Sequence, residues 1–163
     1  MAKRAPSHHP IHIRPGNPDD LDEVMRIMQR AFRPCFGEGW SRSQCAGILP
    51  MSGVTLTMGE DDEGVIGFSL ARTVSDEAEL LLIAVDPDHQ GHGAGSALLQ
   101  HFIADARRSG AHRLHLEVRD GNPAIGLYRA SGFVTAGRRR NYYRGPDGER
   151  HDAVTLMLID VNP

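Results

Sequence analysis

A glycine-rich segment is the part of the sequence whose residue types and spacing most directly suggest chemistry. Gln90-Gly91-His92-Gly93-Ala94-Gly95-Ser96 follows an apolar run and precedes a stretch with the apolar spacing of a helix. The first backbone N–H groups of a helix have no partner inside it, and they carry the positive end of the helix dipole. Glycines let such a backbone approach a ligand closely. The segment therefore predicts a cradle for phosphate groups.

Two common phosphate-binding motifs do not match this segment. A loop for nucleoside triphosphates needs a lysine after its last glycine, and none is present here. A dinucleotide fingerprint, G-x-G-x-x-G counted from Gly91, needs a glycine where Ser96 stands. Taken alone, the segment fits either a cradle for another phosphate ligand or a glycine-rich turn before an ordinary helix.

The elements that position this segment follow from hydrophobic periodicity and from turn residues. Strands are predicted over residues 11–14, 54–58, 65–74, 77–85, 113–118, 133–144 and 153–159. Helices are predicted over 21–31 and 41–49, from the glycine segment to Gly110, and from Asn122-Pro123 to the residue before Gly132. The apolar run within 77–85 predicts a strand buried on both faces. The order of elements indicates an α/β domain on a mixed, largely antiparallel sheet.

Composition bounds the class of protein. The 163 residues suit one domain, and a formal net charge of −3 argues against a general nucleic-acid binder. The longest apolar run, residues 80–85, is too short to span a bilayer, and no apolar stretch follows the charged N-terminus. Two cysteines make no disulfide framework in a chain of this length. We therefore expect a cytoplasmic protein with reduced thiols and no membrane partner.

The N-terminal residues 1–10 are polar and rich in proline and histidine, which predicts a flexible tail. His8, His9 and His12 lie in or near this tail, but no cysteine or carboxylate joins them at ligand spacing. We therefore predict no metal site there or elsewhere in the chain.

The stretch from Asp86 to Leu99 resembles the signature of the GNAT acetyltransferase superfamily. Its acetyl-CoA motif, Q/R-x-x-G-x-G/A, is met by Gln90, Gly93 and Gly95. The resemblance implies one GNAT domain over residues 11–163, with about seven strands flanked by about four helices. It also implies that acetyl-CoA is the cosubstrate. The backbone of Ile83, Ala84 and Val85 would then bond the pantetheine arm, and the amides of Gly91, His92, Gly93, Ala94, Gly95 and Ser96 would hold the pyrophosphate.

Several downstream segments resemble the RimI type, whose members are ribosomal-protein-alanine N-acetyltransferases. They are Leu116-Glu117-Val118-Arg119, Asn122, Leu127-Tyr128, Gly132-Phe133 and Arg139-Arg140-Asn141-Tyr142-Tyr143. This resemblance implies acetylation of a protein N-terminus, here the N-terminal alanine of a ribosomal protein, with no direct contact to nucleic acid. One departure is a spacing of 11 positions from Glu117 to Tyr128, one residue shorter than is common in that type.

The same resemblance assigns roles to individual residues. Alternation on the strand places Glu117 with His115 and away from Leu116 and Val118. The family implies that Glu117 is the general base and that Tyr128 protonates the departing thiolate. It also assigns Asn122 to the cofactor. The alternatives are a solvated carboxylate for Glu117 and a packed aromatic residue for Tyr128.

The acceptor side of the site is less defined by the sequence. Tyr142 and Tyr143 are candidates to hold a peptide. The three arginines before them, Arg138-Arg139-Arg140, fit either a solvated strand face or a lining of the acceptor cleft. Trp40 fits either a packing residue or a wall of the acceptor site. Two other functions remain open at this point. One is a GNAT enzyme for a lysine side chain or a small amine, and the other is a non-catalytic sensor that binds acyl-CoA.

Overall fold

The computed structural model describes residues 9–159, which form a seven-stranded sheet with four α-helices. The strands are β1 (His12–Pro15), β2 (Val54–Asp61), β3 (Gly64–Val74), β4 (Glu77–Val85), β5 (Arg113–Arg119), β6 (Val134–Arg144) and β7 (Arg150–Ile159). The helices are α1 (Leu21–Ala31), α2 (Arg42–Ile48), α3 (Ala94–Arg108) and α4 (Ala124–Ala130), with 3-10 helices η1 (Pro18–Asp20), η2 (Pro34–Phe36) and η3 (Pro87–His89). The predicted order of elements is confirmed, although the last strand begins earlier than the predicted residue 153.

Three expectations drawn from composition meet the structure in different ways. The predicted tail lies outside the described residues except for its last two positions, and there His9 Nδ1 lies 2.9 Å from Asp62 Oδ2. Both cysteines are free thiols, with Cys35 exposed and Cys45 buried. Within residues 9–159, no helix combines the length and apolar composition needed to cross a membrane. The boundaries of the tail and of the single domain stay predictions.

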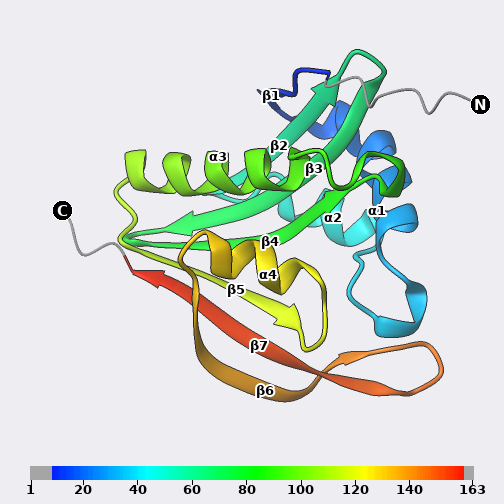
Figure 1. Ribbon diagram of the computed structural model, residues 1–163, viewed down its shortest axis with the longest axis vertical. Helices are drawn as coiled ribbons and strands as arrows, with labels where there is room; N and C mark the ends of the chain where they lie inside the picture. Colours follow the sequence, from blue (N-terminus) through cyan, green and yellow to red (C-terminus); the bar gives the residue numbers. More distant parts are fainter. Residues whose placement is uncertain (1–8, 160–163) are drawn as a thin grey trace, which may run out of the picture.

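The sheet has the strand order β1-β2-β3-β4-β5-β7-β6, and only β4 and β5 pair in parallel. Figure 1 shows α3 and α4 over one face of the sheet and α1 and α2 over the other. Each face covers its own apolar core. One core joins α3 and α4 to β5 and β7, and the other joins α1 to β2 and β3. The mixed, largely antiparallel sheet predicted from the sequence is therefore confirmed.

Helix ends follow local sequence signals. Ser41 begins α2 as expected, because its hydroxyl accepts a hydrogen bond from Gln44 N at 3.2 Å while the Gln44 side chain bonds Ser41 N. The buried positions of α1 are Leu21, Val24, Ile27 and Met28, at the spacing that places them on one helix face. This face packs against β2, β3 and β4 in the second core.

The central feature of the sheet is a separation of β4 from β5. The two strands pair over only four residues, from Glu77 to Leu80 on β4. A bulge follows at Leu81, which has no partner on β3. Bulges bend a strand, and this one sends Leu80 and Leu82 into different cores although regular alternation would place them together. The remainder of β4 therefore turns away from β5 and leaves one edge of its backbone unpaired.

The predicted burial of this strand on both faces is only half right. Ala78, Leu80, Leu82 and Ala84 are buried, whereas the odd-numbered positions from 79 to 85 are half-buried. Three of these half-buried residues, Leu81, Ile83 and Val85, are apolar, so the sequence could not show their partial exposure. They line the pocket described below, and Leu81 and Ile83 also pack against opposite cores.

Candidate active site

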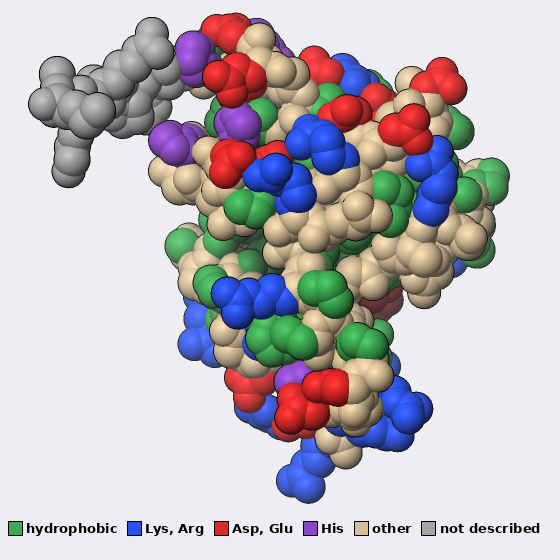
Figure 2. Space-filling view, turned by 90° about the vertical axis from the view of Figure 1, so that its right-hand side faces the viewer, with side chains coloured by type: hydrophobic (Ala, Val, Ile, Leu, Met, Phe, Trp, Pro, Cys, Tyr) green, Lys and Arg blue, Asp and Glu red, His purple; other side chains and the backbone are tan. Residues whose placement is uncertain are grey.

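A pocket of about 910 Å³ lies where β4 and β5 separate. Its walls come from β4, the glycine segment, the end of β5 with the start of α4, and the connection between α1 and α2. Figure 2 views this end of the molecule, where a hollow crosses the face above a part rich in arginine side chains. The lining contains these predicted site residues: Trp40, Ile83, Ala84, Val85, Gln90, Gly91, Gly93, Ala94, Gly95, Ser96, Glu117, Asn122, Tyr128, Tyr142 and Tyr143. His92 was also predicted as a site residue, but it does not line the pocket.

The glycine segment has the geometry of an anion cradle. Gly91 and Gly93 adopt φ angles of 80° and 89°, which are left-handed conformations that other residues reach only at a cost. Gly93 is the N-cap of the fifteen-residue helix α3 and offers no side chain to its first N–H groups. A Cβ at either glycine would meet no atom within 4 Å, so the space beside the backbone is open. The first amides of α3 have no partner inside the helix, so this helix start can bind a phosphate group.

Gln90 holds this segment to the end of β4, and Asp86 joins the turn before the segment to α1. Gln90 Nε2 donates to the carbonyl of Val85 at 3.0 Å, so the motif glutamine closes the loop with its own side chain. Asp86 is buried, accepts from Asp88 N at 3.0 Å and forms an ion pair with Arg26 at 2.9 Å. Burial acts to raise the pKa of Asp86, but the Asp88 N–H and the charges of Arg26 and Arg30 outweigh it and hold that pKa below its usual value.

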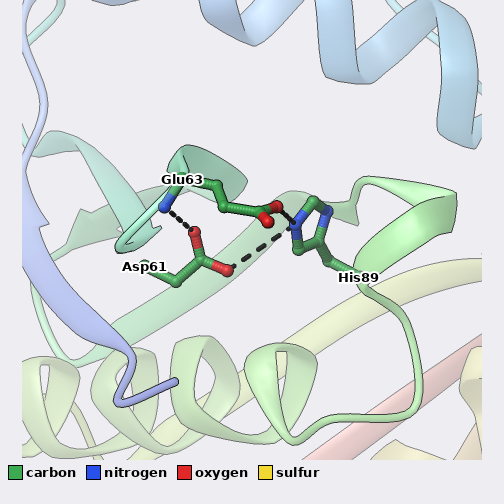
Figure 3. A group of neighbouring side chains, drawn as sticks. All are labelled: Asp61, Glu63 and His89. Atoms are coloured by element: carbon green, nitrogen blue, oxygen red, sulfur yellow. Dashed lines mark hydrogen bonds and ion pairs between the residues drawn. The ribbon is translucent and has the colours of Figure 1, made fainter. Parts of the chain in front are cut away.

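Asp61, Glu63 and His89 gather at the β2–β3 turn, as Figure 3 shows. His89 Nε2 lies 3.1 Å from Glu63 Oε2 and 3.6 Å from Asp61 Oδ2. These residue types can bind metals, and their ligand atoms all lie within 4.8 Å of one another. His89 Nδ1 is buried and has no hydrogen-bond partner. The contacts of His89 with Asp61 and Glu63 join the β2–β3 turn to the loop that precedes Gln90.

Glu117 enters the pocket from β5 with its carboxylate already fixed. Thr155 Oγ1 donates to Glu117 Oε2 at 2.7 Å, and Arg139 Nε lies 3.1 Å from Oε1. Thr155 faces Glu117 directly across the β5–β7 ladder, so the sheet register brings the two together. The side chain of Glu117 is 10% exposed. The alternative reading of a solvated strand carboxylate is therefore wrong.

Tyr128 reaches the pocket from α4. It is 5% exposed, and its ring packs edge-to-face on Phe133 with centroids 6.1 Å apart. Burial raises the pKa of Tyr128, and the charge of Glu38 raises it further. The phenol therefore stays protonated at neutral pH and keeps a proton to donate. Tyr128 is both a packed core residue and a pocket residue, so the two readings of this tyrosine are compatible.

The tyrosine pair on β6 owes its position to an irregular strand. Register shifts between Arg139 and Tyr143, and Asn141 takes a φ of 53°. Asn141 N donates to Asp152 Oδ1 at 3.0 Å, and asparagine tolerates this left-handed conformation better than most residues. The irregularity turns Tyr143 inward, where its hydroxyl donates to the carbonyl of Glu117 at 3.1 Å, and leaves Tyr142 48% exposed.

Two pocket residues to which the sequence analysis gave no role are Glu38 and Arg119. Glu38 is 9% exposed, and its Oε1 accepts from Arg119 Nε at 2.8 Å and from Asn122 Nδ2 at 3.2 Å. Asn122 Oδ1 accepts from Ala124 N at 2.8 Å, so this amide caps the start of α4. Both ends of the Asn122 side chain thus have protein partners, and its assignment to the cofactor stays a prediction. No motif signalled Glu38, because its partners are 81 and 84 residues away.

The fold and the pocket define the class of protein. The sequence pattern described as the Acetyltransferase (GNAT) family matches residues 21–133, which is more than half of the chain. The match spans α1 to the end of α4 and so includes the glycine segment, β5 and most of the pocket. The chain belongs to the GNAT acetyltransferase family, as the glycine motif and element order suggested.

The relatives are more specific. The ribosomal protein bS18-alanine N-acetyltransferase of Escherichia coli (strain K12) is 49% identical over 92 residues, which cover 56% of this chain and 62% of that protein. The protein of the same name from Salmonella typhimurium (strain LT2) is 37% identical over 144 residues, covering 88% of this chain and 93% of that one. The crystal structure of the ribosomal-protein-S18-alanine N-acetyltransferase from Escherichia coli superimposes with a TM-score of 0.81 at 36% identity, covering 94% of this chain and 96% of that one.

Proposed function

We propose that this protein transfers the acetyl group of acetyl-CoA to the α-amino group of a protein N-terminus, namely the N-terminal alanine of ribosomal protein bS18. The observation that carries the proposal is the pocket, in which a phosphate cradle, a fixed carboxylate and a protonated phenol line one continuous space. The acceptor follows the names of relatives that align with most of this chain.

The residues present suit acetyl-CoA. After Leu80, one edge of β4 is free of β5, so the backbone of Ile83 and Val85 can bond an extended pantetheine arm as a neighbouring strand would. The pyrophosphate then fits the open space beside Gly91, Gly93 and the first turn of α3. When bound there, acetyl-CoA supplies the activated thioester.

Glu117 and Tyr128 divide the proton transfers between them. Glu117 accepts a proton from the acceptor ammonium, directly or through a water, and an α-amino group with a pKa near 8 needs only modest help. The freed amine forms the new C–N bond at the thioester carbonyl carbon, and the C–S bond breaks. Tyr128 donates its hydroxyl proton to the departing sulfur, and the second proton that the nitrogen loses as the amide forms restores the phenol. No covalent link to the protein is needed, so the reaction is a direct attack in a ternary complex.

Thr155 and Arg139 keep the Glu117 carboxylate aimed into the pocket. The Arg139 side chain is 62% exposed, so water can solvate its charge when an incoming ammonium replaces it beside Glu117. Trp40 and Tyr143 line the same pocket, and in this proposal they form aromatic walls of the acceptor space. This arrangement suits a chain terminus that enters between the α1–α2 connection and the β6–β7 hairpin.

The test compares two peptides with acetyl-CoA. One has a free N-terminal alanine, and the other has a blocked N-terminus and an internal lysine. We expect a mass gain of one acetyl group on the alanine peptide alone, and a strong loss of that product in Glu117→Gln. Acetylation of the lysine peptide or of small amines alone would instead support the broader GNAT reading. Binding of acetyl-CoA without turnover of any amine would support the sensor reading.

A further inference from the structure

Glu38 is a buried carboxylate that the proposed reaction does not use. It lies on the connection between α1 and α2, where its charge is balanced by Arg119. The side chains of the pair are only 8% and 12% exposed. The Arg119 guanidinium also stacks on Phe36 of the same connection, 3.7 Å from the ring centroid. Buried ion pairs contribute little net stability on average, so their presence calls for another reason.

We find that reason in Asn122, which also bonds Glu38. The Glu38 oxygen that bonds Arg119 also accepts from Asn122 Nδ2, which fixes the amide with Nδ2 toward Glu38 and Oδ1 toward Ala124 N. A flipped amide would place its NH2 group against the Ala124 N–H, where no bond can form. Ala124 is the first residue of α4, and Tyr128 lies about one helical turn further along.

We propose that Glu38 is a positioning residue that fixes the start of α4 through Asn122 and thereby places the Tyr128 hydroxyl in the pocket. The inference rests on the proposed role of Tyr128 as proton donor. The α1–α2 connection then does more than form a wall of the pocket, because it carries Glu38. Glu38 orients Asn122, which caps α4.

The surroundings of Tyr128 support this link. Glu38 and Tyr128 line the same pocket. The pKa of Tyr128 is raised first by burial and second by the charge of Glu38, so the carboxylate lies near the phenol. The short spacing between Glu117 and Tyr128 leaves only Asp120 to Pro123 between β5 and α4. A side chain from outside this brief connection is therefore well placed to set where α4 begins.

A double-mutant cycle tests the proposal. We expect Glu38→Ala to lower kcat about tenfold while the KM for acetyl-CoA stays within about twofold. In Tyr128→Phe, adding Glu38→Ala should cost no further activity, because the group that Glu38 positions is gone. If the two losses multiply instead, Glu38 acts independently of Tyr128 and the proposal is wrong.

The conservative variant and a matched control separate positioning from general stability. Glu38→Gln keeps an oxygen that accepts from Arg119 and Asn122, so its kcat should return to within about threefold of wild type. Asp20→Ala removes another partly buried carboxylate, which bonds Arg14 and does not line the pocket. It should lower the melting temperature but leave kcat unchanged. Equal losses of kcat in Asp20→Ala and Glu38→Ala would overturn the proposal.

Hydrogen exchange provides a readout that does not depend on activity. Glu38→Ala should speed amide exchange in the first turn of α4, whereas Asp20→Ala should not, and unchanged exchange in Glu38→Ala would contradict the link. A wild-type protein that acetylates no amine would refute the proposed function. The hydrogen-exchange comparison would still decide whether Glu38 stabilises the start of α4. If Glu38→Ala does not fold, Asn122→Asp tests the same contact, because it can accept from Ala124 but cannot donate to Glu38.

Discussion

The half of the pocket around the end of β4 and residues 90–96 offers a ligand mostly backbone groups, whereas the other half offers side chains. We call these the cofactor half and the acceptor half. In the cofactor half, the free strand edge and the first amides of α3 come from one continuous stretch of chain. In the acceptor half, Glu117, Tyr128 and Tyr143 come from three elements, and contacts with Thr155, Arg139 and Glu38 hold the half together.

This difference follows from what each half must recognise. A phosphate or an extended arm is bound by repeated N–H and C=O groups, which every residue carries, so glycines and a strand edge are enough. Proton transfer needs particular side chains at particular places. We therefore expect changes in the cofactor half to alter affinity for acetyl-CoA and changes in the acceptor half to alter turnover.

Tyr128→Phe tests the acceptor half and should have the largest effect. Loss of a positioned proton donor costs about 10²–10⁴-fold in rate. The phenyl ring should keep its packing on Phe133, so the KM for acetyl-CoA and the fold should remain close to wild type. Steady-state kinetics with the alanine peptide and titration of CoA measure the two quantities. An unchanged kcat would remove Tyr128 from the mechanism.

Asp86→Asn tests whether the cofactor half depends on its buried anchor. Removing the charge should lower the free energy of unfolding by about 1–2 kcal/mol at pH 7. Because the folded pKa of Asp86 lies below its ordinary value of 3.8, its stabilisation is complete above that value. It is lost as the pH falls through the folded pKa. We therefore expect urea unfolding between pH 7 and pH 3 to show a difference in free energy of unfolding between variant and wild type that decreases only under acid conditions.

The control for this anchor is Asp88→Asn. Asp88 lies on the same loop with its side chain 75% exposed and ion-paired to Arg30. The free energy of unfolding of Asp88→Asn should stay within about 0.5 kcal/mol of the wild-type value. A gap for Asp86→Asn that persists unchanged at pH 3 would show that lost packing, and not lost charge, explains the effect.

Gly93→Ala tests the backbone character of the cofactor half. A non-glycine residue in this left-handed conformation costs about 1–2 kcal/mol, and a shift of the loop to relieve that strain should raise the KM for acetyl-CoA about tenfold. Gly110→Ala is the matched control, because Gly110 has the same φ of 89° and equally open surroundings at the other end of α3. It should leave that KM unchanged. A similar KM for both variants would contradict the phosphate cradle.

Asn141 tests the irregular strand of the acceptor half and should have the smallest effect. Asn141→Val forces a branched side chain into the left-handed region and should cost about 1–2 kcal/mol of stability. The KM for the acceptor peptide should rise a few-fold as Tyr143 shifts. Asn141→Gly keeps the conformation accessible and should remain near wild type in both measurements. Identical behaviour of the two variants would show that the conformation of residue 141 does not position the tyrosines.

Much of the fold could be predicted from the sequence because the signals that specify it are local. Strand alternation, the Ser41 cap and the glycines before α3 each act within a few residues, and each is confirmed. The bulge at Leu81 could not be predicted, since an apolar residue occupies this position as it would in a regular strand. The partial exposure of Leu81, Ile83 and Val85 on β4 could not be predicted for the same reason.

The sequence by itself determined the class of chemistry. The glycine segment specifies a helix start with free amides, and the positions of Glu117 and Tyr128 follow from the family motifs around them. Only the tertiary structure decided how these groups are held. The β5–β7 register brings Thr155 to Glu117, and the α1–α2 connection carries Glu38 across 84 residues to Asn122. Hydrogen bonds between side chains so far apart in sequence leave no periodicity to read, because they exist only once the two cores have formed.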